Sequence, residues 1–211
     1  MNYYTNSRPE MQALLPEKAT KILDVGCGAA EFGASLKRNR CLEVWGVEPV
    51  VDAAKHAIAK IDKVIHAKFE AGIDLPIKYF DAIFFNDVLE HMSQPEEALR
   101  LAKLFLSKNG VIIISVPNFR HFDNLFNLVF KKDAKYLDFG IMDYTHLRVF
   151  TKKSVVRMVM DCGLHPITAK GVNGGFVSPK YYLALIFSLG LSFDTKWLQY
   201  AVVATVNNED E

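Results

Sequence analysis

The sequence predicts a single α/β domain with a largely parallel sheet. Short apolar runs typical of strands buried on both faces occur at 22–25, 42–47 and 111–116. The segment 94–106 has apolar residues at helical spacing between two such runs, and Asn109 and Gly110 are expected to end this helix. Buried strands that alternate with amphipathic helices favour an α/β layer structure over an all-helical or all-strand fold.

Composition excludes several classes of protein. The chain has 211 residues, is 50% hydrophobic, and carries a formal net charge of +1. This balance is typical of one globular domain, and without a basic excess it does not indicate a nucleic acid as primary partner. Three cysteines form neither a disulfide set nor a metal-ligand spacing, which fits a reducing compartment. The first residues lack the order of a signal peptide, so we expect a cytoplasmic protein.

The stretch 21–33, KILDVGCGAAEFG, organises the rest of the chain. An apolar strand carrying Asp24 ends at Gly26, and Cys27 and Gly28 follow before a helix begins. Glycines at such a turn let a ligand lie directly against the main chain. The first turn of the helix also offers unpaired amide groups to polar ligand groups. We therefore predict a nucleoside-binding turn that uses Asp24, Gly26, Cys27 and Gly28.

The acidic residues at this turn discriminate between nucleoside ligands. A dinucleotide fingerprint requires a third glycine three residues after Gly28, but that position holds Glu31. A carboxylate is unfavourable where a pyrophosphate would sit at a helix start. Asp24 favours a ligand with positive charge, such as S-adenosylmethionine, which has an ammonium and a sulfonium. The alternative is a tight strand-to-helix turn in an unrelated α/β protein.

LDVGCGAAEFG resembles the first motif of class I S-adenosylmethionine-dependent methyltransferases, with Ala30 in place of the usual third glycine. The resemblance extends over nearly the whole chain and implies one methyltransferase domain, 1–211. It further implies a Rossmann-like three-layer sandwich, with a mostly parallel seven-stranded sheet and an antiparallel last strand at 197–206. S-adenosyl-L-methionine is the cofactor that this resemblance implies.

Two further segments are expected to bind the nucleoside. Glu48, followed by Pro49, lies 22 residues after Gly26, near the spacing at which an acid accepts hydrogen bonds from ribose hydroxyls. The resemblance places the adenine beside Phe69, which is expected to offer backbone hydrogen bonds and a ring face, and Lys68 replaces the family's usual acid there. Lys68 has no acceptor to offer, so either Glu70 substitutes or adenine is held by packing and main chain.

The block YFDAIFFNDVLEHM, 79–92, places polar residues at the end of another buried strand. Ligands of open α/β sheets bind at the carboxyl ends of strands, so Asn86 and Asp87 are predicted to contact the cofactor. The pattern is similar to that of small-molecule methyltransferases related to ubiquinone-biosynthesis and sugar-modifying enzymes. This resemblance implies that Glu90 and His91 face the methyl acceptor; the structural alternative is a helix cap and its partner.

Residues 119–150 interrupt the strand–helix alternation and are predicted to cover the acceptor side of the site. FGIMDYTHLRVFT, 139–151, resembles a stretch found in polysaccharide- and sugar-modifying methyltransferases. His146 is the first candidate for a general base, with Asp143 fixing its tautomer. Tyr144 and Arg148, together with Asn118 at the end of the preceding strand, are predicted to bind substrate. Alternatively, Asp143 and Arg148 pin the loop as an ion pair, and Asn118 forms a turn.

Both ends of the chain have structural alternatives. Residues 1–20 are either a lid over the cofactor or a solvated leader. The apolar run 181–193 is too short for a transmembrane segment, which takes about 20 residues. It is expected to be a core helix, or else a contact with a membrane surface or a second subunit in a dimer.

The sequence therefore predicts methyl transfer from S-adenosylmethionine to a small-molecule acceptor, most simply a hydroxyl of a sugar or related metabolite. No metal is expected, because the histidines and acids are not at ligand spacing along the chain. Two alternatives stay open: a regulatory relative that binds the cofactor without catalysis, suggested by Ala30 and Lys68, and a nicotinamide oxidoreductase that shares the turn.

Overall fold

A seven-stranded sheet with the order β3-β2-β1-β4-β5-β7-β6 forms the centre of the molecule. The computed structural model describes residues 7–175, 179–187, 190 and 193–206. The pairs β1–β2, β2–β3, β1–β4 and β4–β5 are parallel, whereas β7 runs antiparallel to both β5 and β6. The predicted mostly parallel sheet with an antiparallel last strand is thus confirmed.

The elements follow the expected alternation. The strands are β1 (Lys21–Val25), β2 (Glu43–Val47), β3 (Lys63–Ile65), β4 (Phe80–Asn86), β5 (Leu106–Pro117), β6 (Leu164–Gly174) and β7 (Trp197–Val206). The α-helices are α1 (Pro9–Gln12), α2 (Glu31–Asn39), α3 (Val51–Ala57), α4 (Pro95–Phe105), α5 (Phe122–Phe126), α6 (Lys152–Asp161) and α7 (Pro179–Phe187). The described residues also form the short helices η2 (Leu89–His91), η3 (Asn127–Lys131) and η4 (Phe193–Lys196).

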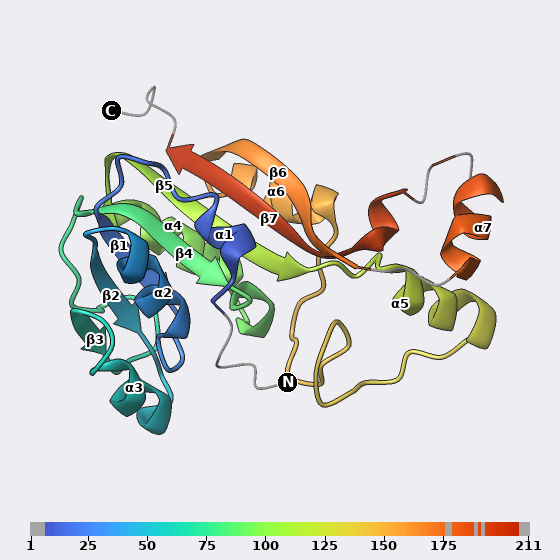
Figure 1. Ribbon diagram of the computed structural model, residues 1–211, viewed down its shortest axis with the longest axis horizontal. Coiled ribbons are helices and arrows are strands. Elements are labelled where there is room, and N and C mark those ends of the chain that lie inside the picture. The colour runs from blue at the N-terminus through green and yellow to red at the C-terminus, as the bar shows by residue number, and fades with distance from the viewer. Residues whose placement is uncertain (1–6, 176–178, 188–189, 191–192, 207–211) are drawn as a thin grey trace.

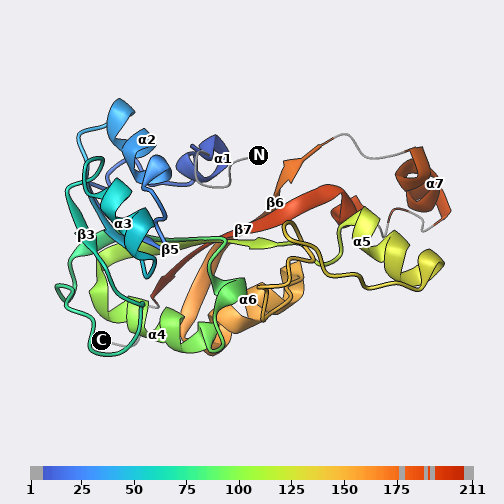
Figure 2. The ribbon, with the colours of Figure 1, turned by 90° about the horizontal axis from the view of Figure 1, so that it is seen from below.

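Helices cover both faces of the sheet (Figures 1 and 2). α1, α2 and α3 lie on one face, and α4 and α6 lie on the other. A buried hydrophobic cluster fills each interface, one around Ile22, Val44 and Phe84, the other around Leu23, Phe85 and Ile112. Alternate residues of β1 and β4 thus enter opposite clusters, as the two-residue period of a strand requires.

The start of β5 differs from the sequence-based expectation. We expected a helix that Asn109 and Gly110 end and a strand at 111–116, but α4 ends at Phe105 and β5 begins at Leu106. Leu106 pairs with Phe80, and the register shifts before Val111 pairs with Ala82. A Cβ at Gly110 would lie 2.8 Å from the carbonyl oxygen of Phe80. Glycine therefore permits this close strand approach, and it does not end a helix here.

The inserted segment begins away from the nucleoside-binding half of the sheet. α5 and η3 lie beside α7 at the opposite end of the molecule from α2 and α3 (Figures 1 and 2). Phe122 of α5 packs against Tyr181 of α7 with ring centroids 5.8 Å apart, in a small cluster separate from the two main ones. The predicted helix is thus present as α7, and its buried Tyr181 packs in this small cluster and not in either main cluster, while 188–189 and 191–192 lie outside the described residues.

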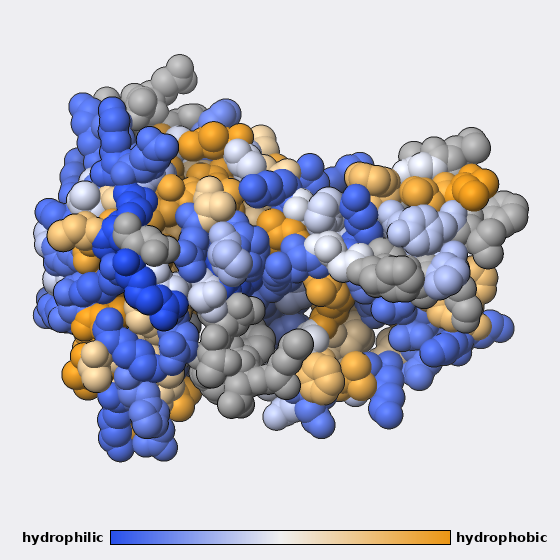
Figure 3. All heavy atoms as spheres, viewed as in Figure 1, coloured by the Kyte–Doolittle hydropathy of each residue, from blue (hydrophilic) through white to orange (hydrophobic). Residues whose placement is uncertain are grey.

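The α7 end of the molecule presents apolar side chains to solvent. Hydrophobic residues are visible over this end in Figure 3, and Ile186 and Phe130 are 69% and 72% exposed. Among the residues that the structure describes, no helix has the length and apolar character needed to cross a lipid bilayer. The membrane-surface and dimer contacts suggested for 181–193 remain predictions.

Candidate active site

The glycine turn lies at the carboxyl end of β1. Gly26 has φ +69° and donates its N–H to Val47 O at 2.8 Å, which joins the turn to β2. A Cβ at Gly26 would lie 2.6 Å from Val88 Cγ2. Gly28 also has a positive φ, +55°. Both positions therefore favour glycine, because a side chain would be strained at either one and would meet a close neighbour at Gly26. The Cys27 thiol is buried beside this turn, and burial, followed by the charge of Asp24, raises its pKa.

Ala30 stands at the third position of the turn, where the family usually has glycine. Ala30 adopts φ +58° and caps the N-terminus of α2, a conformation that glycine would adopt without strain. Glu31 does not present a free carboxylate there, because Lys60 Nζ lies 2.6 Å from its Oε1 and also donates to Ala29 O. The unfavourable charge expected from Glu31 is therefore paired, and this ion pair occupies the flank of the helix start.

Asp24 and Asn86 place buried acceptors near the carboxyl ends of β1 and β4. The Asp24 side chain is buried, and Asn86 Nδ2 donates to its Oδ1 at 3.4 Å. Burial raises the pKa of Asp24 to about 7, against the lowering effects of Asn86 and the Arg8 charge. Asn86 Oδ1 is also buried and has no hydrogen-bond partner within the described structure. The unpaired Asn86 Oδ1, together with the Asp24 carboxylate beside it, fits an ammonium group.

Glu48 lies directly after β2 and faces the same turn. Its carboxylate accepts hydrogen bonds from Gly28 N at 2.7 Å and from Val50 N at 2.8 Å. The side chain is 6% exposed, yet a carboxylate has about four lone-pair sites and can accept more than these two bonds. Its position supports the predicted ribose contact.

The adenine side differs in part from the prediction. The Phe69 ring is buried in the hydrophobic core, edge to face with Phe85 and Phe105, so it does not offer a free face to a base. Its main chain remains a candidate contact. Lys68 and Glu70 lie next to it, and the Glu70 side chain is exposed. The carbonyl of Pro49 contacts His66 Nε2 at 3.1 Å, which joins the segments after β2 and β3.

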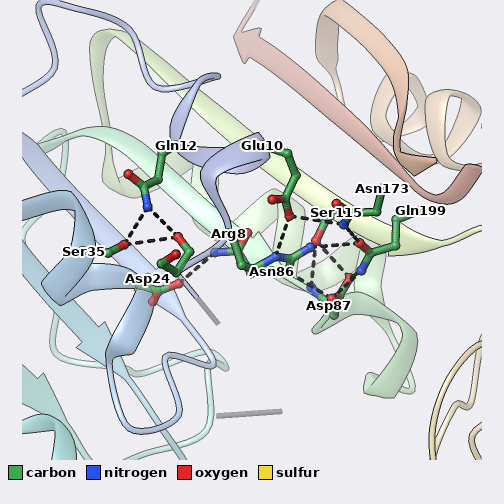
Figure 4. A network of polar contacts seen from close by, with 11 residues as sticks. Arg8, Glu10, Gln12, Asp24, Ser35, Asn86, Asp87, Ser115, Asn173 and Gln199 are labelled. Atoms are coloured by element: carbon green, nitrogen blue, oxygen red, sulfur yellow. Dashed lines mark hydrogen bonds and ion pairs between the residues drawn. The ribbon is translucent and has the colours of Figure 1, made fainter. Parts of the chain in front are cut away.

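A polar network that the sequence did not predict fixes Asp87 (Figure 4). Arg8 Nη1 donates to its carboxylate at 2.9 Å, Ser115 Oγ at 3.0 Å and Gln199 Nε2 at 2.6 and 2.7 Å. Asp87 also has φ +54°, so its side chain leaves the strand end in an unusual direction. These bonds occupy the carboxylate, which makes Asp87 a support of the site and not the free cofactor ligand we predicted.

The leader contributes to the same network. Arg8 is 8% exposed and also donates to Glu10 and Gln199, so it joins α1 to β4 and β7. Gln12 donates to Ser35 Oγ of α2 at 2.8 Å. Residues 7–12 therefore pack across the carboxyl edge of the sheet, as Figure 4 shows, whereas residues 1–6 of the predicted lid lie outside the described residues. No pattern in the sequence marks Arg8 or Gln199 for this role.

Glu90, His91 and His146 converge next to this network. Their potential ligand atoms all lie within 4.8 Å of one another, and the two imidazole rings meet edge to face at a centroid distance of 4.7 Å. Glu90 is fully buried, and both its carboxylate oxygens lack a partner among the described residues. Burial and then the charge of Asp87 raise the pKa of Glu90 well above its usual value. Burial and then His146 lower the pKa of His91.

No metal was expected because the histidines and acids are not at ligand spacing along the chain, and that argument did not foresee this cluster. That argument considered neighbours along the chain, whereas His146 comes from the inserted segment, 55 residues after His91. Backbone hydrogen bonds hold the two segments together, because the N–H groups of Leu147 and Arg148 donate to Glu90 O at 2.8 and 3.0 Å. The last part of the insertion is therefore held against η2, on the side where we predicted it to cover the acceptor.

Asp143 does not orient His146 as predicted. Its Oδ1 accepts from Thr145 N at 2.8 Å and from Thr145 Oγ1 at 2.7 Å, a local turn of the kind that Asp often forms. Burial opposes these bonds, but they lower the pKa of Asp143 overall. Thr145 Oγ1 in turn lies 3.1 Å from His91 Nδ1. Asp143 is thus connected to the other histidine, while His146 Nδ1 contacts Ile141 O at 3.1 Å.

Two of the predicted substrate residues have structural roles. Asn118 is buried, donates to Asp194 O and Trp197 O, and accepts from Arg120 N, so its amide is fully used within the chain. Arg148 donates to Ser93 O, and no ion pair with Asp143 occurs among the described residues. Tyr144 is 65% exposed and accessible to a ligand. The alternative turn role is therefore supported for Asn118, but the alternative ion pair is not.

The fold and the site together define a class of protein. A parallel sheet with a glycine turn after β1, an acid after β2 and unsatisfied acceptors after β4 is an α/β nucleoside-binding arrangement that favours a cationic ligand. The comparisons extend this conclusion. A family model described as "Methyltransferase domain" matches residues 4–169, and the chain belongs to this family.

Sequence and structural relatives agree with this assignment. The chain is 24% identical over 193 residues to a "Ubiquinone biosynthesis O-methyltransferase" of Psychrobacter arcticus, covering 86% of this chain and 73% of that protein. It is 30% identical over 124 residues to the mitochondrial protein of that name from Mus musculus, covering 54% of this chain and 33% of the relative. A SAM-dependent methyltransferase from Archaeoglobus fulgidus has a similar fold, with a TM-score of 0.66, 19% identity and coverage of 94% and 91%.

The protein is therefore an S-adenosylmethionine-dependent methyltransferase. The residues present fit that cofactor. Gly26 and Gly28 adopt the positive φ that the turn requires, and the buried acceptors of Asp24 and Asn86 match a group with several N–H donors. The nicotinamide oxidoreductase alternative has no support from these comparisons.

Proposed function

We propose that this enzyme methylates a hydroxyl group of a small molecule, a sugar or a related metabolite. The observation that carries the proposal is the cluster of Glu90, His91 and His146, which lies beside the cofactor residues at the carboxyl end of β4. The names of the curated relatives, O-methyltransferases, also support an oxygen acceptor.

In this proposal the chain positions the two reactants. S-adenosylmethionine supplies a methyl group on a positively charged sulfur. Asp24 and Asn86 hold the ammonium group and Glu48 the ribose hydroxyls. The main chain at Gly26 and Gly28 allows close approach. Orientation of donor and acceptor is worth ~7 to 11 kcal/mol in well-aligned reactions, so it supplies most of the rate.

The histidine pair completes the acceptor side. In the metal-free protein, His146 and His91 are the proposed groups that take the hydroxyl proton, an effect typically worth ~10² to 10⁴-fold. His146 also lines a shallow depression together with Arg148 and mainly apolar residues, namely Pro117, Phe119, Ile141, Val149 and Phe150. An acceptor in this depression would bring its hydroxyl beside the pair.

A second acceptor class follows from the same depression. Phe119 and Phe150 line it, and aromatic side chains pack well against an aromatic ring. Together with the names of the relatives, this favours a phenolic hydroxyl as the alternative to a sugar hydroxyl.

An acceptor panel tests the proposal directly. Transfer of labelled methyl from S-adenosylmethionine is measured with hydroxylated sugars, nucleotide sugars, catechols and other phenols. We expect turnover with one hydroxylated class, and we expect His146→Ala to remove turnover while cofactor affinity stays nearly constant. His165→Ala is the matched control, because His165 is exposed on β6. Transfer only to amines or carbon acids, or unchanged turnover in His146→Ala, would contradict the proposal.

A further inference from the structure

We propose that Glu90, His91 and His146 form a binding site for a divalent transition-metal cation on the acceptor side of the active site. The proposed use of the cation, to hold the acceptor hydroxyl, rests on the proposed function. The existence of the site does not, because it depends only on side chains of this chain.

The first observation is a buried carboxylate without a partner. Glu90 is 0% exposed, and neither carboxylate oxygen is hydrogen bonded among the described residues. Buried polar groups in native proteins are almost always paired, and an exception calls for an explanation such as an ion. The Glu90 main chain is held by Leu147 N and Arg148 N, so the residue is fixed in place. A cation bound between Glu90 and the histidines would satisfy this carboxylate.

The second observation is the tautomer that the neighbours of each imidazole select. His146 Nδ1 contacts the carbonyl oxygen of Ile141 at 3.1 Å, and a carbonyl can only accept, so Nδ1 carries the proton. Thr145 Oγ1 donates to Asp143, and its lone pair therefore accepts from His91 Nδ1 at 3.1 Å. In both rings the lone pair is consequently on Nε2, which is therefore the ring atom available to a metal.

These contacts form the arrangement that orients metal-binding histidines. Such a histidine almost always donates its other ring N–H to a carboxylate, a backbone carbonyl or water. Ile141 O has this role for His146, and Thr145 O, 3.3 Å from His91 Nδ1, has it for His91, with Thr145 Oγ1 and Asp143 beside it. The inserted segment thus provides one proposed ligand and the supports of both imidazoles.

The donor set indicates the kind of cation. Two imidazoles and one carboxylate suit zinc, manganese, iron or cobalt, whereas magnesium prefers oxygen ligands. Three protein ligands also leave at least one coordination position for an oxygen from water or substrate. Metal–ligand bonds of about 2.0 to 2.2 Å place tetrahedral ligand atoms about 3.3 to 3.6 Å apart. The potential ligand atoms here lie within 4.8 Å of one another, so the widest pair must close in by about 1 Å when the cation binds.

Cation binding would change the role of the histidines. With Nε2 of both rings bound to the metal, neither ring takes the acceptor proton. The open coordination position would instead hold the hydroxyl beside the cofactor residues, and the cation would lower the pKa of that hydroxyl, so that its proton passes to solvent water when the oxygen takes the methyl group. The depression lined by His146 and Arg148 gives an acceptor access to this position.

Metal binding is measured without cofactor or acceptor. The full chain is stripped with chelator and titrated with Zn²⁺, Mn²⁺ and Mg²⁺ by calorimetry, and retained metal is counted by mass spectrometry. We expect one Zn²⁺ or Mn²⁺ per chain and much weaker binding of Mg²⁺. Glu90→Gln and His146→Ala should each weaken Zn²⁺ binding about 100-fold or more, and Asp143→Asn about 10-fold, which is the lower end for a supporting residue.

The controls separate this site from adventitious binding. His165→Ala and Cys41→Ser remove other exposed candidate ligands and should leave the stoichiometry unchanged. If Glu90→Gln fails to fold, electron paramagnetic resonance of Mn²⁺ on the native chain, with nitrogen coupling from two imidazoles, is the deciding measurement. Absence of one-to-one binding, or binding that all three cluster variants (Glu90→Gln, His91→Ala and His146→Ala) leave intact, would overturn the proposal.

The result is distinguishable from a failure of the proposed function. Metal binding with no methyl transfer to any hydroxylated acceptor would support the site and contradict the acceptor assignment. Methyl transfer to a hydroxylated acceptor by a chain that binds neither Zn²⁺ nor Mn²⁺ would support the acceptor assignment and contradict the metal site.

Discussion

Gly28 donates its backbone N–H to Glu48 Oε2 at 2.7 Å, so the turn after β1 is bonded directly to the acid after β2. Two cofactor elements that lie 20 residues apart in the chain thereby share one hydrogen bond. The same carboxylate accepts from Val50 N and is held in a single orientation. Its remaining lone pairs are available to ribose hydroxyls without further rearrangement.

We expect Glu48→Gln to weaken cofactor binding by roughly 10- to 100-fold, since hydrogen bonds to charged groups contribute about 1.5 to 3 kcal/mol. The amide can still accept from Gly28 N, but its NH₂ group faces the N–H of Val50 and cannot accept from it. Calorimetric titration with S-adenosylmethionine measures the change. Glu17→Gln, at an exposed position, is the control, and equal affinity in both variants would exclude the ribose role.

Cofactor affinity should depend on pH through Asp24. Its pKa is raised to about 7, so below that pH the free protein carries a neutral Asp24 and must release a proton to pair with an ammonium group. We expect affinity for S-adenosylmethionine to rise as pH increases from 5 to about 7, by up to about tenfold per unit. Besides burial, the side chains of Arg8, Glu48 and Asn86 act on this pKa.

Asp24→Asn is the matched variant for this dependence. It should bind the cofactor more weakly at pH 7, with an affinity that is nearly flat from pH 5 to 7. Stability of the free protein has the opposite trend. A carboxyl with a raised pKa contributes stability that is complete below pH 3.8 and is lost as pH rises through about 7. Chemical unfolding of both proteins at several pH values checks this, and parallel curves would contradict the role of Asp24.

Gly26→Ala should disrupt the turn. The added Cβ would lie 2.6 Å from Val88 Cγ2, and alanine at φ +69° is strained by about 1 to 2 kcal/mol. We expect a lower melting temperature and loss of measurable cofactor binding. Gly175→Ala is the control, because a Cβ added there would meet no neighbour within 4 Å and the backbone φ is not positive. Tight binding by Gly26→Ala would show that the ligand does not approach this main chain.

Arg8→Met should destabilise the protein by removing a buried ion pair. Asp87 would keep its charge at 9% side-chain exposure without the guanidinium, and breaking such a pair costs about 3 to 5 kcal/mol. Denaturant unfolding measures this cost. The double variant Arg8→Met with Asp87→Asn should recover part of the stability, whereas Arg38→Met, at an exposed helix position, should have little effect. Additive losses in the double variant would mean that the two residues are not coupled.

The nucleoside half of the site could be predicted from sequence because of one geometric rule. Parallel strands end at the same edge of a sheet, so Asp24, Glu48 and Asn86, each at a strand end, had to lie near one another. The glycine spacing then identified the turn. The orientation of the Phe69 ring could not be predicted in this way, because Phe69 lies after β3 and no strand period says whether its side chain faces the core or a ligand.

The acceptor half could not be predicted because its contacts depend on irregular segments. His146 reaches Glu90 through backbone bonds of Leu147 and Arg148, and no periodic pattern encodes such a crossing. Asp143 bonds to its neighbour Thr145, since a short side chain close to a backbone N–H competes with distant partners. Arg8 was missed because an isolated arginine in a leader does not reveal a buried partner.

The antiparallel direction of β7 has a consequence for biosynthesis. Because β7 begins at the carboxyl edge, Gln199 reaches Asp87, and the network that includes Arg8 joins residues 191 positions apart. A nascent polypeptide emerging from the ribosome cannot assemble this network before residue 199 has been translated. Until then Asp87 lacks the partner that β7 supplies, so we expect a ribosome-stalled fragment that ends before β7 to bind the cofactor more weakly than the full chain.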